Sequence, residues 1–167
     1  MSALDATVGS CSARPAQPRD LPVLAIFERE LAKQAFPTDP ILDLAYHERK
    51  LARALAAQPD GMIVLTDDAT GEIAAWLWMA TRKTLATGEQ YGIVRSIYVL
   101  PDYRGKGLGR CLAQYARRYF DGKDLEKVVA KVHATNTAGI RLLRQIGFEE
   151  LHVTMEYRSG EDGQRQA

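Results

Sequence analysis

The sequence has no excess of charge of one sign. Its 167 residues include 22 Lys and Arg against 21 Asp and Glu, which gives a formal net charge of +1. Proteins that hold nucleic acid or an anionic membrane by electrostatic attraction need a basic surface. We therefore predict that neither nucleic acid nor a membrane is a partner.

Long apolar runs are also lacking. None comes near the roughly 20 residues that a membrane span needs. Residues 1–15 show neither the basic nor the apolar stretch of a secretory signal. The composition is ordinary for a globular chain, with 46% hydrophobic and 26% charged residues. We expect a cytoplasmic protein with a single domain over residues 10–158 and disordered tails at residues 1–9 and 159–167.

Cysteine is scarce. The chain has only Cys11 and Cys111. They stand too far apart in the sequence to form the closely spaced pairs of a zinc knuckle or a redox centre. We therefore predict no metal cofactor.

Apolar spacing predicts the order of the secondary structure. Stripes at intervals of three or four residues indicate helices, and alternation indicates strands. Strands are predicted within residues 10–18 and at 61–68, 73–83, 91–100, 127–134 and 148–157, and helices from residue 18, over 41–57, after 108 and around 140–146. Together they predict an α+β fold, a mixed twisted sheet of about six or seven strands flanked by about four helices.

The segment 97–109, IYVLPDYRGKGLG, carries the clearest chemical signal. A strand runs into a turn, and Arg104-Gly105-Lys106-Gly107-Leu108-Gly109 opens a helix. The first N–H groups of a helix have no internal acceptor and attract anions. Glycines let a phosphate approach the backbone, and the two basic residues add charge. The pattern indicates a phosphate-binding loop, and a glycine-rich turn without a ligand stays open as the alternative.

Two nucleotide-binding patterns do not fit this loop. The dinucleotide fingerprint GxGxxG needs a third glycine where Arg110 stands, and a P-loop needs Ser or Thr after the Gly-Lys pair, where Gly107 stands. A nucleotide-binding protein is therefore the poorer interpretation.

The sequence over about residues 91–148 resembles the GNAT superfamily of acetyl-CoA-dependent N-acetyltransferases. The resemblance rests on the glycine loop, on the HATN segment that ends at Asn136, and on a helix followed by Gly147-Phe148. It implies that Arg104, Gly105, Lys106, Gly107, Leu108 and Gly109 cradle the coenzyme A pyrophosphate, that backbone groups of Ile97, Tyr98 and Val99 bind the pantetheine arm, and that Asn136 borders the coenzyme. The coenzyme would enter between the strands 91–99 and 127–134.

The family's catalytic residues do not carry over. Many members place a Tyr seven residues after the Asn, where it protonates the departing thiolate, but this position is Leu143. Other members place a Glu near Ile93 or near Lys131, and neither position is acidic here. His133 and Tyr91 remain as candidates for proton transfer. An imidazole suits the role of general base because its ordinary pKa lies near neutral pH. Purely structural roles for both stay open.

The resemblance implies transfer of an acetyl group from acetyl-CoA to a primary amine of a small molecule or a peptide. Direct attack in a ternary complex is expected, because no activated cysteine is evident. Trp76 and Trp78 share one strand face, where they line either the sheet core or a substrate groove. The alternative function is a non-catalytic acyl-CoA-binding sensor or partner module, which Leu143 supports. A homodimer also stays open.

Overall fold

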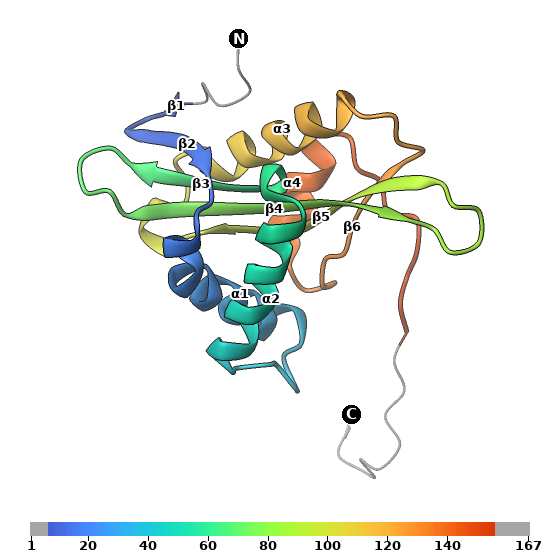
Figure 1. The fold of residues 1–167 in the computed structure, drawn as a ribbon, viewed down its shortest axis with the longest axis horizontal. Coiled ribbons are helices and arrows are strands. Elements are labelled where there is room, and N and C mark those ends of the chain that lie inside the picture. The colour runs from blue at the N-terminus through green and yellow to red at the C-terminus, as the bar shows by residue number, and fades with distance from the viewer. Residues whose placement is uncertain (1–6, 156–167) are drawn as a thin grey trace, which may run out of the picture.

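The computed structural model describes residues 7–155, which form a twisted sheet with helices on both faces (Figure 1). The strands follow one another across the sheet in chain order. Neighbouring strands are antiparallel except for the last pair, β5 and β6, which is parallel. The strands are β1 (Thr7–Val8), β2 (Cys11–Pro15), β3 (Met62–Asp67), β4 (Ile73–Lys83), β5 (Gln90–Val99) and β6 (Val128–Ala130).

Four α-helices cover the sheet within the described residues. They are α1 (Leu21–Ala35), α2 (Leu44–Ala57), α3 (Leu108–Asp121) and α4 (Thr137–Gln145). α1 and α2 pack against each other on one face, and α3, with α4 beside it, lies on the other (Figure 1). None of these helices combines the length with the apolar composition that a membrane span requires.

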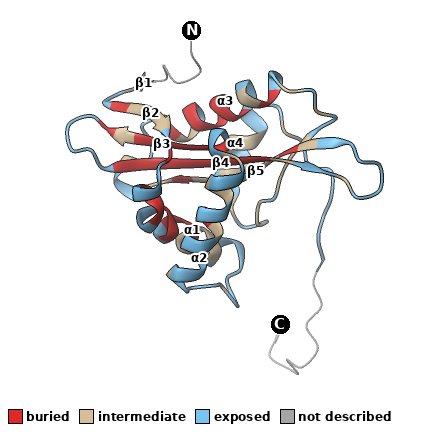
Figure 2. Cartoon of the chain, viewed as in Figure 1, coloured by how far each residue is buried: buried red, intermediate tan, exposed pale blue. Residues whose placement is uncertain are grey.

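Two apolar layers hold the helices on the sheet. On one face Trp76 and Tyr98 pack with Phe27 of α1. On the other face Leu77 packs with Leu112 of α3. The central strand β4 is buried on both faces along most of its length (Figure 2). Burial on both faces explains why the sequence of β4 is an almost continuous apolar run.

The predicted α+β class, the mixed sheet and the four helices are confirmed, but the strand 127–134 is shorter than predicted. Pairing of β5 with β6 ends at Val94 and Ala130. The next residue, Arg95, is a β-bulge, because Val94 pairs with Met79 and Ser96 with Trp78, which leaves Arg95 over. A bulge bends its strand, so β5 leaves the edge of β6 at this residue.

The strand predicted over 148–157 is wrong for residues 148–155, which carry no strand; the last two residues lie outside the described chain. Leu151, Val153 and Met155 alternate, but all are largely exposed. Alternation becomes a strand only where a neighbour completes the ladder, and residues 7–155 offer this segment no such neighbour. Five strands have three or more residues and β1 has two, so the prediction of six or seven was slightly high.

The N-terminal tail is shorter than predicted. Residues 7 and 8 form β1, and Gly9 follows in a turn with a positive φ of 63°. The rest of both predicted tails, residues 1–6 and 159–167, lies outside the described residues.

Candidate functional site

The glycine loop lies between the end of β5 and the start of α3. Gly105 and Gly107 have positive φ angles of 76° and 85°, a backbone conformation that other residues adopt only with strain. Gly107 is the N-cap of α3, and the first backbone bond into the helix runs from Cys111 N–H to its carbonyl, at 3.0 Å. The N–H groups of residues 108–110 precede this bond and form the anion-attracting end of the helix.

Gly109 differs from the other two glycines. It lies inside α3, and a Cβ there would meet Leu142 of α4 at 3.5 Å and Val99 at 3.9 Å, which are ordinary contacts. The sequence predicted that all three glycines make room for a phosphate. The positive φ angles show that Gly105 and Gly107 are needed for the shape of the loop, whereas Gly109 lies in helical backbone. That the three glycines make room for a phosphate stays a prediction.

Three cations surround the loop. The Arg104 Nε donates a 3.0 Å hydrogen bond to the Val99 carbonyl, and its guanidinium lies 5.8 Å from the Tyr98 ring centre. The Lys106 ammonium lies 5.0 Å from the Tyr103 ring centre. Arg110 follows in the first turn of α3. None of the three forms an ion pair with any residue of 7–155, so their charge is available to an anion.

The outer edge of β5 is open beyond Val94. The Leu100 N–H bonds to the Ala74 carbonyl at 2.9 Å, and backbone groups of successive residues alternate between the two edges of an antiparallel strand. The groups of Tyr98 therefore belong to the ladder with β4, whereas those of Ile97 and Val99 point to the open edge. The Tyr98 side chain lies in the core, stacked on Phe27 with ring centres 4.8 Å apart.

Asn136 and His133 lie in the turn between β6 and α4. The Asn136 Oδ1 caps α4 by accepting the Gly139 N–H at 2.9 Å, so only its side-chain NH₂ is left for a ligand. The His133 Nδ1 lies 2.7 Å from the Thr135 hydroxyl and 3.3 Å from the Thr135 N–H. The prediction placed His133 on a strand face with Lys131, but both residues follow the end of β6.

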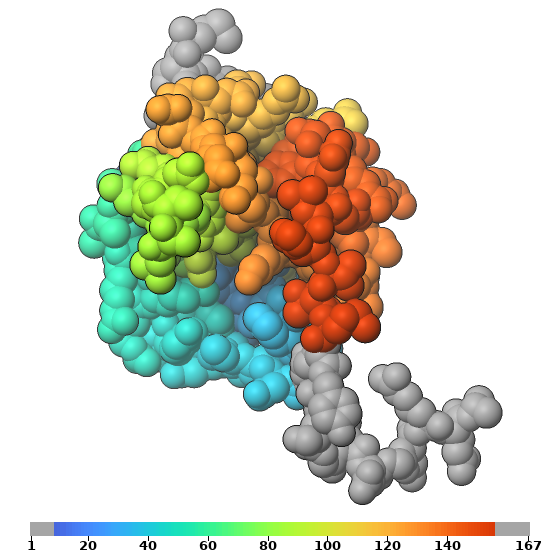
Figure 3. Space-filling model, turned by 90° about the vertical axis from the view of Figure 1, so that its right-hand side faces the viewer, coloured from blue at the N-terminus to red at the C-terminus, as the bar shows by residue number. Residues whose placement is uncertain are grey.

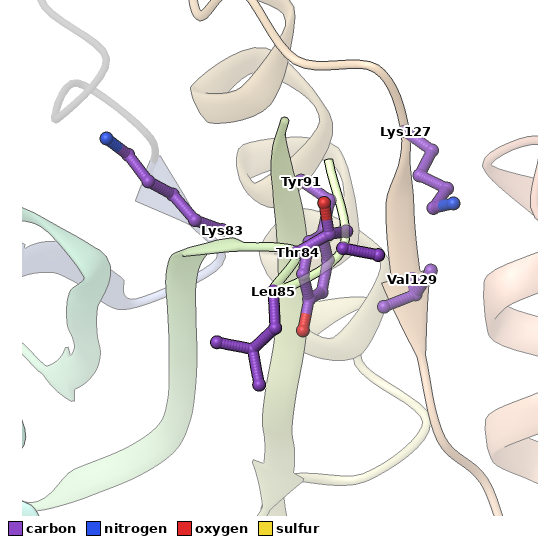
Figure 4. A pocket seen from close by; sticks show the side chains of 7 residues that line it. Lys83, Thr84, Leu85, Tyr91, Lys127 and Val129 are labelled. Carbon is purple, nitrogen blue, oxygen red and sulfur yellow. The ribbon is translucent and has the colours of Figure 1, made fainter. Parts of the chain in front are cut away.

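Tyr91 lies at the other end of β5. It lines an open hollow of about 590 Å³ beside the β4–β5 hairpin, together with Leu85 and Val129. Figure 4 shows Tyr91 close to Leu85, whereas Lys83 and Lys127 point away on either side. At about 3.3 Å per residue, Tyr91 is roughly 20 Å from Ile97 along the strand. The structure therefore does not bring Tyr91 together with the loop, Asn136 and His133.

The cysteines show no sign of activation. Burial raises the pKa of the Cys111 thiol and, with the help of the nearby Asp67 and Asp68 carboxylates, that of Cys11. A thiol with a raised pKa is a poor nucleophile at neutral pH. Within residues 7–155, no three His, Cys, Asp or Glu side chains gather closely enough to hold a metal ion.

The sequence did not reveal Arg95. As the bulge residue, it marks the point where β5 and β6 part, and its guanidinium lies 4.8 Å from the Trp78 ring centre. A bulge depends on how two strands pair, so no pattern within a single strand could have indicated it.

Comparison with known proteins agrees with this geometry. Residues 25–148 match the model of the acetyltransferase (GNAT) family. An L-methionine sulfoximine/L-methionine sulfone acetyltransferase of Pseudomonas paraeruginosa is 33% identical over 143 residues, which are 84% of this chain and 81% of that protein. A mycothiol acetyltransferase of Thermobifida fusca is 33% identical over 94 residues, 54% of this chain; the chain spans only 29% of that relative's length.

Solved structures show the same fold. A possible acetyltransferase from Clostridium difficile 630 superposes with a TM-score of 0.69 at 20% identity, and the match covers 90% of this chain and 98% of that one. The family match spans the sheet from β3 to β6, all of α2 and α3, and the glycine loop between β5 and α3. This chain belongs to the GNAT acetyltransferase family.

Proposed function

We propose that the protein transfers an acetyl group from acetyl-CoA to a primary amine by direct attack within a ternary complex. One observation carries the proposal: the N-terminal end of α3, with three cations that form no ion pair within residues 7–155, lies next to the open edge of β5. A coenzyme with an anionic pyrophosphate and an amide-bearing arm needs those two features side by side.

Each group of the site has a task in this proposal. The pyrophosphate binds at the loop, where the N–H groups at the start of α3, Arg104 and Lys106 supply donors and charge. The backbone groups of Ile97 and the Val99 N–H bind the amides of the pantetheine arm as a neighbouring strand would, while the Val99 carbonyl accepts the Arg104 Nε. The Asn136 NH₂ borders the arm from the side of α4.

Acetyl-CoA supplies an activated acetyl group, because its thiolate is a good leaving group. Orientation then accounts for most of the rate that the protein must provide. Both thiols have raised pKa values, which favours direct attack by the amine over a cysteine-bound intermediate. Leu143 cannot give a proton to the thiolate, so water does so in this proposal.

His133 is a weak candidate for the base. The Thr135 N–H points at its Nδ1, so in the neutral ring that nitrogen accepts and the proton lies on Nε2. The nitrogen that could accept a proton is therefore turned toward its own loop. We assign deprotonation of the amine to solvent, and Tyr91, at the far end of β5, takes no part.

The acceptor is a small molecule in this proposal. The two relatives described above are named for mycothiol and for methionine sulfoximine or sulfone, which are small molecules. In Figure 3 the surface is hollowed where the orange chain after β6, the red segment after α4 and the blue α1 region meet.

The test is thiol release from acetyl-CoA with a panel of primary amines, with the acetylated products identified by mass. The proposal predicts release that depends on one class of amine. Binding of acetyl-CoA without turnover of any amine, at any pH, would instead favour the second candidate, a non-catalytic acyl-CoA sensor. The observations in favour of the sensor are Leu143 in place of the family's Tyr and the engaged Nδ1 of His133.

A further inference from the structure

We propose that Arg95 binds a carboxylate of the acceptor, so that the substrates are amino acids and related amino carboxylates rather than polyamines. This inference rests on the proposed function, and it names the substrate class. The observation behind it is a single arginine, unpaired among the described residues, at the point where the sheet opens.

Two observations give the direction of the Arg95 side chain. Val94 packs in the apolar layer beside α3, so alternation places Arg95 on the other face, which α1 and α2 cover. The contact of Arg95 with the Trp78 ring agrees with this. The bulge interrupts the alternation after Arg95, so that Ser96, which pairs with Trp78, shares the same face.

Arg95 therefore stands on the acceptor side of the gap. The candidate pyrophosphate loop lies at the start of α3, on the opposite face of the sheet, and in this proposal the acetyl group reaches past the edge of β5 to the face of α1 and α2. Arg95 is two residues from Ile97, or about 7 Å along the strand. The amine of an α-amino acid lies only about 3 Å from its carboxylate, and a hydrogen bond of about 2.8 Å joins the carboxylate to a guanidinium, so together they span most of this distance.

Of the two cations that contact the Trp78 ring, only Arg95 has no carboxylate partner among the described residues. Lys50 also contacts the Trp78 ring, at 5.2 Å, but its ammonium lies 2.8 Å from the buried Glu28 carboxylate. The other Glu28 oxygen accepts the Trp76 indole N–H at 3.2 Å. Glu28 thus compensates Lys50 and holds both tryptophans in place. Arg95 is exposed and has no carboxylate partner within residues 7–155.

A carboxylate fits this arrangement better than a phosphate or a second amine. The guanidinium is a planar fork that binds a carboxylate through two hydrogen bonds, and the Trp78 ring fixes its plane. One uncompensated positive charge balances one carboxylate, whereas a phosphate carries nearly two negative charges. A polyamine would bring further positive charge next to Arg95 and be repelled.

The first experiment compares acceptors that differ only in the carboxylate. Thiol release is measured with L-amino acids, with their carboxamides and with the decarboxylated amines, for the wild type, Arg95→Gln and Arg95→Lys. Arg53→Gln is the matched control, because Arg53 is exposed on α2 and forms no ion pair with any described residue.

The proposal predicts that Arg95→Gln lowers kcat/KM for the preferred amino acids about 10- to 100-fold, the usual effect of losing a charge-assisted pair. Arg95→Lys keeps the positive charge but lacks the two-pronged guanidinium, so its kcat/KM should lie between those of the wild type and Arg95→Gln. Activity toward decarboxylated amines and the KM for acetyl-CoA stay as in the wild type. An equal loss for all acceptors, or a wild-type preference for amines without a carboxylate, including phosphate-bearing ones, would overturn it.

A binding measurement separates this inference from the proposed function. N-acetylated glycine, methionine and phenylalanine, and their carboxamides, are titrated by calorimetry into the protein saturated with coenzyme A. At least one carboxylate should bind to the wild type and to Arg53→Gln but not to Arg95→Gln. If no amine is turned over but this pattern appears, the transferase proposal fails and the carboxylate site stands. If amines are acetylated but the binding of no carboxylate depends on Arg95, the carboxylate site fails and the transferase proposal stands.

Discussion

At the scale of single residues, the glycines of the loop from Arg104 to Gly109 have different structural roles. Gly107 has a φ of 85°, and Gly109 has helical backbone with space for a Cβ. Although both belong to the same sequence pattern, only the first is needed for the shape of the loop. The pattern GxGxG therefore contains two different physical requirements, which substitutions can separate.

We predict that Gly107→Val weakens acetyl-CoA binding at least about 10-fold, because a branched residue at this φ costs about 1–2 kcal/mol and distorts the loop. Gly109→Ala is the matched control and should change the affinity less than about 3-fold, since its Cβ meets only ordinary contacts. Calorimetric titration measures both, with far-UV circular dichroism to verify folding. Equal losses in the two variants would show that the loop geometry is not what binds the phosphates.

The proton transfer is also a matter of single residues. With Leu143 in the donor position, we predict that kcat/KM rises with pH toward the pKa of the amine and shows no fall near pH 10 that a phenol donor would cause. Leu143→Tyr should introduce such a fall, and His133→Ala should leave the profile unchanged because its Nδ1 is engaged by Thr135. An acidic limb that His133→Ala abolishes would make His133 the base after all.

At the scale of elements, one ion pair ties the first long helix to the sheet. Arg14 of β2 donates two hydrogen bonds, of 2.7 and 2.9 Å, to the buried Asp20 carboxylate, which also accepts the Gln17 N–H. Burial alone would raise the pKa of Asp20, but the hydrogen bonds from Arg14 and Gln17 outweigh it, so the pKa lies below its usual value. The ionised form is the one that stabilises the fold.

We predict that Asp20→Asn lowers the free energy of unfolding by about 1–3 kcal/mol at pH 5 to 7. The difference should shrink as the pH falls below about 4 through the lowered native pKa, where the wild type also loses the charge. Urea unfolding of the wild type and Asp20→Asn at pH 7, 5 and 3 measures this difference in the free energy of unfolding. Glu30→Gln, on a half-exposed pair with Lys33, should cost under about 1 kcal/mol at each pH. A difference for Asp20→Asn that does not vary with pH would contradict this role.

Elements also show where the sequence predicted well and where it did not. The prediction for β4 is correct to the residue, because its apolar run ends where polar residues and a turn begin. β6 is three residues long rather than eight because the Arg95 bulge bends its partner away. The segment with Leu151 and Val153 has strand alternation but no neighbouring strand. Both errors concern pairing between segments, which local periodicity does not contain.

The candidate site divides in the same way. The loop from Arg104 to Gly109 and the capping residue Asn136 were predicted from local patterns, and the structure places them at the starts of α3 and α4. Tyr91 was predicted too, but it lies at the other end of β5. Arg95 was not predicted, because its importance depends on the strand pairing that leaves it where β5 parts from β6. Whether these residues perform their assigned tasks stays a prediction.

At the scale of the whole molecule, the two faces of the sheet carry different groups. α3 and α4 lie on one face and α1 and α2 on the other (Figure 1). The cations of the loop adjoin the start of α3, whereas the tryptophans, Glu28, Lys50 and Arg95 lie on the α1 and α2 face. Between the two faces, the edge of β5 beyond Val94 has no partner strand among the described residues. A donor bound on one side and an acceptor on the other would meet there, which is the arrangement that a direct transfer requires.

Calorimetric titration of the wild-type protein with acetyl-CoA, ATP and NAD is the decisive test of whether the loop before α3 binds coenzyme A. We expect one acetyl-CoA site per chain and far weaker binding of ATP and NAD. We also expect that acetyl-CoA at a hundred times its Kd raises the stability by about 2.7 kcal/mol, seen as a higher Tm. Tight binding of ATP with none of acetyl-CoA would contradict the account.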